Sequence, residues 1–414
     1  MIHFNQPCII GNEMEYIRQA VAGGKLSGNG EFTHRCQNFF EERYGFKKCL
    51  LTTSCTDALE MAAILTGVGL GDEVIVPSYT FVSSALAFVR TGATIVFADS
   101  SADQPNIDAD KIESLITPHT KVIVPVHYAG CACEMDKIMA IAERHGLLVV
   151  EDAAQAVDSF YFSRGDREIG RENSRKEHRD HKDGCRPAAQ KLPLGGIGHL
   201  AAFSFHETKN ITAGGEGGML VINDERFVRR AEIIWEKGTN RAEFFRGEVN
   251  KYGWVDTGSS FLPSEINAAY LWAQLENLDK IQTRRREIWN RYYERLKAVD
   301  VVTQGRVTLP AIPAYATNNA HMFYLLFPDL DKRSAFIAKM RSAEILTPFH
   351  YLPLHSSAFI QQIGESIGPQ IPMLPNCDRY ADTLVRLPLY YALGDDQTLV
   401  LETLEKILKE DKSC

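Results

Sequence analysis

The sequence contains no apolar run approaching the roughly 18–20 residues that a membrane-spanning helix needs. Its first eight residues, MIHFNQPC, lack the basic start and the apolar stretch of a secretory signal. Positive charge is not in excess, because 45 lysines and arginines stand against 53 acidic residues and no long basic stripe is present. We therefore expect a cytoplasmic protein whose partners are neither a membrane nor a nucleic acid.

A disulfide framework is also missing from the sequence. The nine cysteines are scattered without a regular spacing. The CxC pair at residues 131–133 has no second pair at the spacing of a zinc site. We expect reduced thiols and no metal ion.

Large apolar side chains are almost absent from Ser163–Lys191, which is crowded with charges of both signs. Such a segment cannot bury enough surface to offset the entropy lost on ordering. We expect an inserted, mobile surface loop, with a partner-binding segment as the alternative. His178, His181 and Cys185 lie within it, but we do not predict a metal site there.

Short apolar runs do alternate with helical patterns between about residues 50 and 225. The five runs lie at residues 48–52, 73–77, 93–99, 121–127 and 147–152, and helical patterns follow at 56–63 and 135–145. Continuous runs of β-branched residues separated by helices indicate a mostly parallel sheet covered on both faces. Sheets of this α/β class bind ligands outside the carboxyl ends of their strands.

The length of 414 residues fits two domains. After about residue 275 the pattern changes to an arginine-rich amphipathic helix at 281–296, a strand at 321–327 and a helix at 332–342. We predict a large α/β domain over residues 1–280 and a smaller α+β domain over residues 281–414.

Three parts of the large domain carry the groups that pyridoxal phosphate requires. Lys209 lies in the block SFHETKN (204–210), just before a glycine cluster at 214–218, and provides an amine for the cofactor's aldehyde. Asp152 ends an apolar strand and provides a carboxylate for the pyridine nitrogen. The loop TSCTD (53–57) lies between a strand and a helix, where hydroxyls and N–H groups cradle phosphate.

Each of these residues also has an ordinary structural explanation. Lys209 could be a surface lysine at a turn, and Asp152 could cap the next helix. Ser54 or Thr56 could cap the helix that follows them. Phe81, which we place against the cofactor ring, could be a core phenylalanine. The three features together, in this order along an α/β pattern, favour the cofactor site.

At these residues the sequence resembles the DegT/DnrJ/EryC1/StrS family of sugar aminotransferases. The resemblance extends from GKLSGNG (24–30) to LPLY (387–390). The blocks that carry it are GDEVIVPSYTF (71–81), EDAAQ (151–155), FSFHETKN (203–210) and EINAA (265–269). The family implies the fold-type I architecture of aspartate aminotransferase, with a mostly parallel seven-stranded sheet, and pyridoxal 5'-phosphate as cofactor. Its members have only a short turn where residues 163–191 stand.

The resemblance also implies a role for each matching residue. Lys209 makes the covalent link to the cofactor and carries the proton, and Asp152 pairs with the pyridine nitrogen. The other implied contacts are Gln155 on the ring hydroxyl, Phe81 on the ring face, and Thr56, Asp57 and Ser204 on the phosphate. In relatives a second subunit completes the phosphate site, and Ser260 is the matching position. A homodimer with shared active sites follows.

Within the family, four blocks resemble the subgroup that makes TDP-4-amino-4,6-dideoxygalactose for enterobacterial common antigen. They are GCACEMD (130–136), EKGTNR (236–241), FFRG (244–247) and AHMFY (320–324). This subgroup implies transfer of the amino group of L-glutamate to C4 of TDP-4-keto-6-deoxy-D-glucose. The candidate substrate contacts are Arg241 and Arg246 on the diphosphate and His321, His350 and Tyr351 on the sugar. Surface arginines and core aromatic residues are the alternative explanations.

Three other functions compete with this one. The first is amino transfer to another nucleotide-linked keto sugar, at C3 or on a UDP- or GDP-linked substrate. The second is a pyridoxamine-dependent dehydratase, which is disfavoured because those relatives replace the lysine at position 209 with histidine. The third is a cofactor-binding regulator or scaffold without enzyme activity, because fold alone does not settle function.

Overall fold

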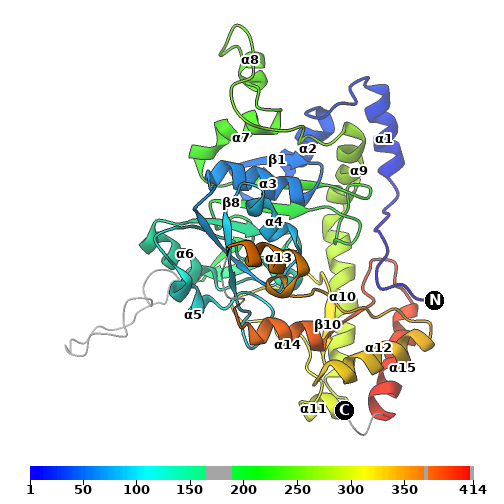
Figure 1. The fold of residues 1–414 in the computed structure, drawn as a ribbon. Coiled ribbons are helices and arrows are strands. Elements are labelled where there is room, and N and C mark those ends of the chain that lie inside the picture. Colours follow the sequence, from blue (N-terminus) through cyan, green and yellow to red (C-terminus); the bar gives the residue numbers. More distant parts are fainter. Residues whose placement is uncertain (164–188, 368–371, 411–414) are drawn as a thin grey trace, which may run out of the picture.

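The computed structural model describes residues 1–163, 189–367 and 372–410 (Figure 1). Most of the charged segment predicted as an inserted loop, including His178, His181 and Cys185, lies outside the described residues. The ends of that segment join two paired strands, β6 (Phe160–Ser163) and β7 (Gln190–Pro193).

The large part of the molecule is built on a seven-stranded sheet in the order β1-β9-β8-β5-β4-β2-β3. Only β9 runs antiparallel to its neighbours. The predicted mostly parallel sheet of a fold-type I enzyme is therefore confirmed. The strands are β1 (Lys48–Thr52), β2 (Glu73–Pro77), β3 (Thr94–Ala98), β4 (Thr120–Ile123), β5 (Leu148–Asp152), β8 (Leu200–Ser204) and β9 (Gly218–Ile222).

Both faces of the sheet are apolar, which explains the continuous apolar runs in the sequence. In β1, Leu51 faces one hydrophobic core, whereas Leu50 faces another, as the two-residue period of a strand requires. In β5, Val149 and Val150 divide between the same two cores. The predicted run at 121–127 gives a shorter strand than expected, because β4 ends at Ile123, although Val126 still forms an isolated parallel bridge with Asp152.

Helices from distant parts of the chain cover the two faces (Figure 1). Those packed in the first core are mainly α2 (Glu31–Tyr44), α6 (Met135–His145) and α9 (Glu265–Glu276). Those packed in the second core are mainly α3 (Cys55–Thr66), α4 (Ser83–Val89) and α7 (Val228–Trp235). Shorter or peripheral helices are α1 (Glu13–Ala22), α5 (Ala109–Ile112) and α8 (Arg241–Phe245).

A third hydrophobic core is formed almost entirely by residues after Ile288. It packs around a two-stranded antiparallel sheet of β10 (Phe323–Leu326) and β11 (Leu384–Leu387). The helix α10 (Leu278–Leu296) runs from the large sheet into this core (Figure 1). The remaining helices are α11 (Asp300–Thr303), α12 (Leu330–Ser342), α13 (Ala358–Ile367), α14 (Pro375–Thr383) and α15 (Asp396–Glu410). A domain boundary at residue 280 stays a prediction.

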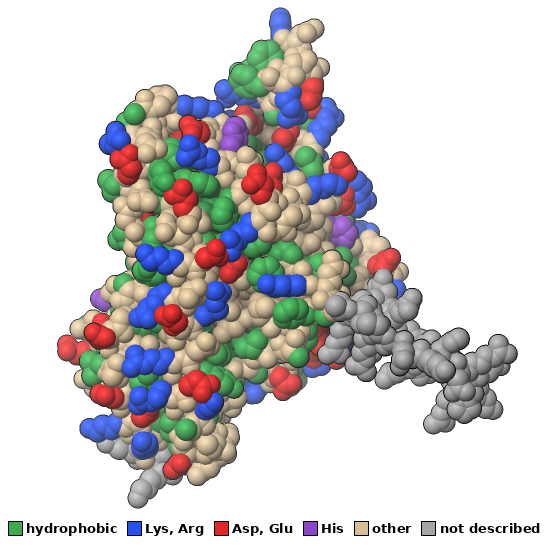
Figure 2. Space-filling model, turned by 180° about the vertical axis from the view of Figure 1, so that it is seen from behind, with side chains coloured by type: hydrophobic (Ala, Val, Ile, Leu, Met, Phe, Trp, Pro, Cys, Tyr) green, Lys and Arg blue, Asp and Glu red, His purple; other side chains and the backbone are tan. Residues whose placement is uncertain are grey.

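Figure 2 shows the molecule from behind the view of Figure 1, and acidic and basic side chains are interspersed over this face. No helix among the described residues is both long enough and apolar enough to cross a membrane.

Candidate active site

A cavity of about 670 Å³ opens at the carboxyl ends of the parallel strands. Strands β1, β2, β5 and β8 all end at this edge of the sheet, because they run in the same direction. The residues at or just after their ends line the cavity: Ser54, Phe81, Asp152 and Ser204. Lys209 lines it as well, so the predicted lysine and the predicted carboxylate share one cavity.

Lys209 carries the only lysine amine on the cavity wall within the described chain. No described residue forms a hydrogen bond or an ion pair with it. Burial lowers the pKa of Lys209, Cys55 and Asp152 oppose this effect, and the charge of Arg386 adds to it. The site therefore favours the neutral amine, which is the form that reacts with an aldehyde or accepts a proton.

The carboxylate of Asp152 is buried and fixed in orientation. Its Oδ2 accepts a hydrogen bond of 2.6 Å from the Ser84 hydroxyl, and its Oδ1 accepts one of 3.1 Å from the Ala154 backbone N–H. Ser84 belongs to α4, whereas Asp152 ends β5, so two elements hold the carboxylate at the cavity edge. This anion suits a positively charged ring nitrogen.

A helix N-terminus and several hydroxyls form another wall of the cavity. Ser54 caps α3, and its Oγ accepts a 3.1 Å hydrogen bond from the Asp57 N–H. Thr56 Oγ1 lies 2.7 Å from Ser83 Oγ, and both residues line the cavity. Hydroxyls at the positive end of a helix favour an anion such as phosphate.

The loop that carries these hydroxyls packs tightly against β9. A side chain at Gly218 would begin 2.3 Å from the Ser54 carbonyl carbon. Only glycine allows this close approach, so the predicted glycine cluster has a structural role beside the lysine.

Phe81 offers an apolar face for a ring. Its side chain is 55% exposed, which is unusual for a phenylalanine at a strand end, and it lines the cavity. Gln155 lines the cavity near it, with Oε1 accepting from the Ala129 N–H at 2.6 Å and Nε2 donating to the Tyr351 hydroxyl at 2.9 Å.

These groups fit pyridoxal phosphate on chemical grounds. The unpartnered amine of Lys209 suits its aldehyde, and the fixed carboxylate of Asp152 suits its pyridine nitrogen. The hydroxyls at the α3 N-terminus suit its phosphate, and the exposed ring of Phe81 suits its aromatic face.

The three residues predicted to contact the sugar, His321, His350 and Tyr351, line the same cavity. Burial holds the pKa of both histidines well below the ordinary range, so both rings are neutral. His350 Nδ1 lies 2.7 Å from the Tyr128 hydroxyl, and its ring stacks on Tyr351 at 3.6 Å. The cavity therefore presents uncharged hydrogen-bonding groups on this side.

The tautomer of His321 follows from its neighbours. Its Nδ1 lies 2.9 Å from Asn210 Oδ1. The Asn210 amide nitrogen donates to the carbonyl of Asn319 at 2.9 Å, which fixes the oxygen as the group that faces His321. Because the ring is neutral and Nδ1 donates, Nε2 is left as an acceptor that suits a substrate hydroxyl.

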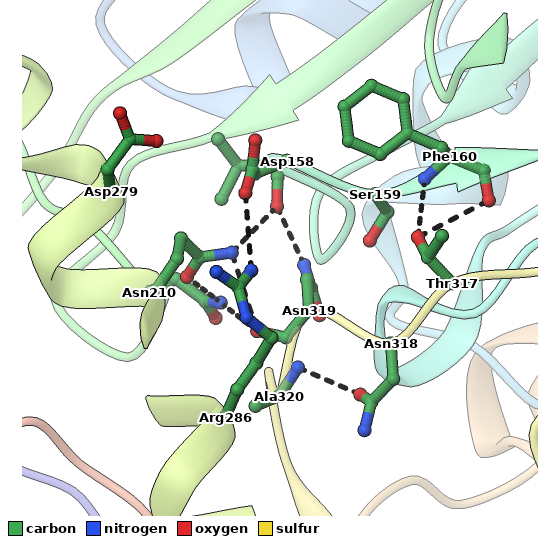
Figure 3. A network of polar contacts seen from close by, with 12 residues as sticks. Asp158, Ser159, Phe160, Asn210, Asp279, Arg286, Thr317, Asn318, Asn319 and Ala320 are labelled. Atoms are coloured by element: carbon green, nitrogen blue, oxygen red, sulfur yellow. Dashed lines mark hydrogen bonds and ion pairs between the residues drawn. The ribbon is translucent and has the colours of Figure 1, made fainter. Parts of the chain in front are cut away.

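A network of buried amides holds this part of the cavity together (Figure 3). Asn210, next to Lys209, also donates to Gln282 of α10 at 2.8 Å. Asn319 donates to the carbonyls of Gln155 and Val157 at 2.8 and 2.9 Å. The network ties the segments of Lys209, Gln155 and His321 to one another, and the sequence analysis assigned no role to Asn210 or Asn319.

Four predicted site residues do not line the cavity of this chain. Asp57 directs its carboxylate to the Thr53 hydroxyl. Arg241 and Arg246 lie in and after α8, which projects from the body of the molecule (Figure 1). Ser260 is exposed, and its backbone pairs with that of Glu236 in an isolated β-bridge. For Ser260 a place on the surface is what a contribution to a second subunit requires, and that contribution stays a prediction.

The two arginines already have acidic partners. Arg246 contacts Glu232 at 2.8 Å and Glu248 at 2.7 Å. Arg241 lies 3.9 Å from Glu236 and over the ring of Phe245.

Sequence reasoning missed two charged residues of the cavity, Glu216 and, in β11, Arg386. The sequence does contain a sign of Arg386, a lone arginine within the apolar run LVRLPL.

Among the described residues no group of three or more metal-binding side chains exists, and the seven cysteines there form no disulfide.

Comparisons with known proteins agree with this geometry. The model of the DegT/DnrJ/EryC1/StrS aminotransferase family matches residues 7–405. The spore coat polysaccharide biosynthesis protein SpsC of Bacillus subtilis is 31% identical over 417 residues, which cover 98% of this chain and 97% of that protein. The GDP-perosamine synthase of Caulobacter vibrioides is 33% identical over 374 residues, which cover 87% of this chain and 89% of that protein.

A solved structure is similar throughout. The aminotransferase TlmJ from Streptoalloteichus hindustanus superposes with a TM-score of 0.82 at 28% identity, and the match covers 99% of both chains.

Proposed function

Since the chain belongs to the DegT/DnrJ/EryC1/StrS aminotransferase family, we propose that it transfers the amino group of L-glutamate to C4 of TDP-4-keto-6-deoxy-D-glucose. The products are TDP-4-amino-4,6-dideoxy-D-galactose and 2-oxoglutarate. Membership of this family makes the chain a sugar aminotransferase that acts on nucleotide sugars and uses pyridoxal phosphate, as the sequence predicted.

The observation that carries the proposal is the meeting of Lys209 and Asp152 in one cavity. Lys209 comes from the loop after β8, and Asp152 comes from the end of β5. A lysine in this place also disfavours the dehydratase, whose relatives carry histidine there. A scaffold protein has no need for a desolvated amine opposite a fixed carboxylate.

In the proposed amino transfer, each residue of the cavity has a separate role. The bound cofactor supplies an electron sink for the carbon that loses its proton. Lys209, whose pKa is lowered by burial, would take that proton and return it later in the reaction. Asp152, held by Ser84 and Ala154, would pair with the pyridine nitrogen and hold the proton there. Gln155 and Tyr351 are hydrogen-bonded to each other, and both line the cavity that would hold the ring.

The part of the cavity wall formed by His321 and Tyr351 suits a sugar substrate. The free Nε2 of His321 accepts a hydrogen bond, and the hydroxyl of Tyr351 can donate or accept one. Neutral groups of this kind match sugar hydroxyls, whose positions differ between C3 and C4 keto sugars. Arg241 and Arg246 lie outside the cavity of their own chain, so a contact with the nucleotide diphosphate would involve the neighbouring subunit.

We propose a homodimer in which Ser260 of one subunit completes the phosphate site of the other. The exposed position of Ser260 supports this assignment, and two-fold dimers are the commonest closed oligomers. A cytoplasmic location is part of the same proposal and rests on the reduced thiols expected from the sequence.

A second candidate substrate is a GDP-linked keto sugar. It is favoured by the similarity to a protein named GDP-perosamine synthase at 33% identity. TDP and GDP differ in their base, so the nucleotide side of the cavity decides between the two.

The test is a substrate panel. Purified enzyme is given L-glutamate with TDP-, UDP- and GDP-linked 3-keto and 4-keto sugars, and formation of 2-oxoglutarate and product configuration are measured. We expect the highest kcat/KM with the TDP-linked 4-keto-6-deoxy sugar and an axial amine at C4. A higher kcat/KM with a GDP-linked or 3-keto sugar would establish the alternative.

A further inference from the structure

Two buried amide side chains, Gln155 and Asn210, have their orientation fixed by the backbone. Gln155 Oε1 accepts a hydrogen bond of 2.6 Å from the Ala129 N–H, a group that can only donate. Asn210 Nδ2 donates at 2.9 Å to the carbonyl of Asn319, a group that can only accept. The oxygen and the nitrogen of both amides are thereby assigned. The direction of the hydrogen bond that each amide makes to a neighbouring ring therefore follows.

Gln155 leaves Tyr351 as a hydrogen-bond donor. Its Nε2 donates to the Tyr351 hydroxyl at 2.9 Å, so the phenol oxygen is the acceptor in this contact. The Tyr351 proton must then point elsewhere, and no described residue accepts it. Burial, followed by the charge of Asp152, raises the pKa of Tyr351, so the phenol keeps this proton. Because Tyr351 lines the cavity, it offers an O–H group to a ligand.

Asn210 leaves His321 as a hydrogen-bond acceptor. Asn210 Oδ1 lies 2.9 Å from His321 Nδ1, so Nδ1 carries the single proton of the ring. Burial, followed by the charge of Lys209, holds the pKa of His321 well below its ordinary value, so the ring is neutral. Within the described chain Nε2 has no partner, and His321 lines the cavity. The lone pair of Nε2 accepts from a hydroxyl group but repels a carboxylate or phosphate oxygen.

Two other buried rings show what purely structural residues of these types look like. His127 uses both ring nitrogens within the protein, since Nε2 meets a buried carboxylate at 2.8 Å and Nδ1 accepts from a backbone N–H at 3.2 Å. Tyr292 donates its proton to a backbone carbonyl at 2.9 Å. Neither ring lines the cavity. His321 and Tyr351 differ from them because each keeps one hydrogen-bonding position for a ligand.

Both of these positions lie close to the groups assigned to amine transfer. The charge of Lys209 acts on the ring of His321, and the charge of Asp152 acts on the phenol of Tyr351. A substrate presents its reacting carbon to the same two charged groups. The parts of the substrate that His321 and Tyr351 meet are therefore those nearest the reacting carbon, namely the ketone oxygen and the substituent on the neighbouring carbon.

We propose that Gln155 and Asn210 are positioning residues that make the cavity selective for an α-hydroxy ketone, a ketone with a hydroxyl group on the neighbouring carbon. Tyr351 donates to the ketone oxygen and stabilises the charge that develops there. His321 Nε2 accepts from the neighbouring hydroxyl group. This assignment rests on the proposed function, because a 4-keto sugar with a free 3-hydroxyl group is a ligand of this class.

The first test combines a substrate analogue with a substitution of His321. The pyridoxamine phosphate form of the enzyme is mixed with TDP-4-keto-6-deoxy-D-glucose or with its 3-deoxy analogue, and the change in cofactor absorbance gives kcat/KM for each. We expect the wild type to discriminate against the analogue about 10-fold or more, because the analogue leaves a buried acceptor unsatisfied. His321→Leu should lose this discrimination. Discrimination that persists in His321→Leu would overturn the proposal.

A surface histidine provides the matched control for this substitution. His145 pairs with Glu113 at 3.0 Å and does not line the cavity. His145→Leu should discriminate against the 3-deoxy analogue as strongly as the wild type does.

The second test removes the proposed donor. Tyr351→Phe keeps the ring that stacks on His350 but lacks the O–H group. We expect kcat for the keto sugar to fall about 100-fold, because a hydrogen bond to a developing charge is lost, while discrimination against the 3-deoxy analogue remains. Tyr16→Phe removes a hydroxyl that contacts Glu276 away from the cavity and should leave kcat unchanged. A Tyr351→Phe kcat equal to that of Tyr16→Phe contradicts the assignment.

The role of Gln155 is tested through Tyr351. The carboxylate in Gln155→Glu cannot donate to the phenol, so Tyr351 turns its proton toward the glutamate and away from the substrate. If Gln155 acts by orienting Tyr351, the losses in Gln155→Glu and Tyr351→Phe are not additive, and the double variant is no slower than the slower single variant. Additive losses mean that Gln155 acts independently of Tyr351 and refute its positioning role.

A spectroscopic measurement tests Asn210 without any turnover. In holoenzyme labelled with 15N at histidine, the nitrogen chemical shifts report which ring nitrogen carries the proton, and His321→Leu assigns the signal. We expect the proton on Nδ1 in the wild type and in Asn210→Asp, which keeps an oxygen in the same place. We expect it on Nε2 in Asn210→Leu, where no oxygen faces Nδ1, and this variant should also lose the discrimination. A proton on Nε2 in the wild type overturns the proposal, whether or not Asn210→Leu folds.

The proposed function and this selectivity fail in different ways. If the wild type transfers an amine to none of the keto sugars, the proposed function is wrong, whereas the tautomer of His321 still tests Asn210. If the wild type reacts equally well with ketones that have and lack the neighbouring hydroxyl group, the proposed function stands and the selectivity for an α-hydroxy ketone is wrong.

Discussion

Glu151 is a buried carboxylate next to Asp152 whose removal should cost much of the stability of the enzyme. Its two oxygens accept four hydrogen bonds. The donors are His127 Nε2 at 2.8 Å and the N–H groups of Gly195, Ile197 and Gly198 at 2.9, 2.8 and 2.5 Å. These contacts hold the loop before β8 against β5, and both strands end at the cavity.

The substitution Glu151→Gln tests this arrangement at constant size. The glutamine oxygen can still accept two of the hydrogen bonds, but its NH2 group faces the remaining donors. Two bonds to a charged group are lost, each contributing about 1.5–3 kcal/mol, so we expect a loss of about 3–6 kcal/mol. A folded domain has a total stability of about 5–15 kcal/mol. The variant should therefore be partly unfolded or sharply less stable.

The assay is urea unfolding, followed by far-ultraviolet circular dichroism of the apoenzyme. The midpoint for Glu151→Gln should fall far below that of the wild type, at an unchanged slope. Glu225→Gln is the matched control, because Glu225 pairs with Lys47 at the surface, and its midpoint should not move. A Glu151→Gln midpoint equal to that of the control would refute the reasoning.

The same site makes stability depend on pH. Burial opposes the ionisation of Glu151, but the hydrogen bond and charge of His127 and the backbone N–H groups outweigh it and hold the pKa below its ordinary value of 4.5. A carboxyl group whose folded pKa is lowered contributes stability above its unfolded pKa and loses it as the pH falls through the folded value. The difference in stability between wild type and Glu151→Gln should therefore be constant near neutral pH and shrink below about pH 4.5.

Three further predictions concern the cavity. Lys209→Ala should leave the fold intact, abolish turnover and remove the cofactor absorbance that responds to glutamate; a near-normal rate contradicts the assigned role. Asp152→Asn should slow the donor half-reaction about 100-fold or more, since a fixed charge opposite the developing one is lost, and single-turnover absorbance measures it. Mixing inactive Lys209→Ala with an inactive Ser260→Glu should restore about a quarter of wild-type activity, because half of the randomly formed dimers have one intact site; no recovery argues against shared sites.

Much of the sheet could be predicted because its physical cause is local. A strand buried on both faces needs an apolar residue at every position, so the runs at 73–77 and 147–152 were visible as β2 and β5. The sequence did not predict that β9 runs antiparallel to its neighbours. Its residues, GMLVI, are equally apolar whichever way the strand runs. Strand direction depends on the partners in the sheet, and these are set by the whole topology.

Residues that line the cavity could be predicted where they stand at or near the end of a strand. Asp152 and Phe81 were proposed in this way, because the carboxyl ends of parallel strands meet at one edge, whereas Ser204 was assigned only from the family resemblance. Asn210 and Asn319 could not be assigned a role, since partners such as Asn319 for Asn210 and Val157 for Asn319 lie more than a hundred residues away in the sequence. Their function is to fix Lys209 and His321 relative to each other, which only the folded arrangement reveals.

The arginines show most clearly why charge in a sequence does not by itself predict an anion site. Arg241 and Arg246 were chosen because they stand in motifs, yet they pair with acidic residues of α7 and of the segments on either side of α8: Glu232, Glu236 and Glu248. Arg386 stands alone in an apolar strand, and no acidic side chain among the described residues forms an ion pair with it. The capacity of an arginine to bind a ligand depends on the charge that its surroundings leave uncompensated. By this criterion Arg386, unlike the two motif arginines, keeps an uncompensated charge beside the cavity in the described part of the chain.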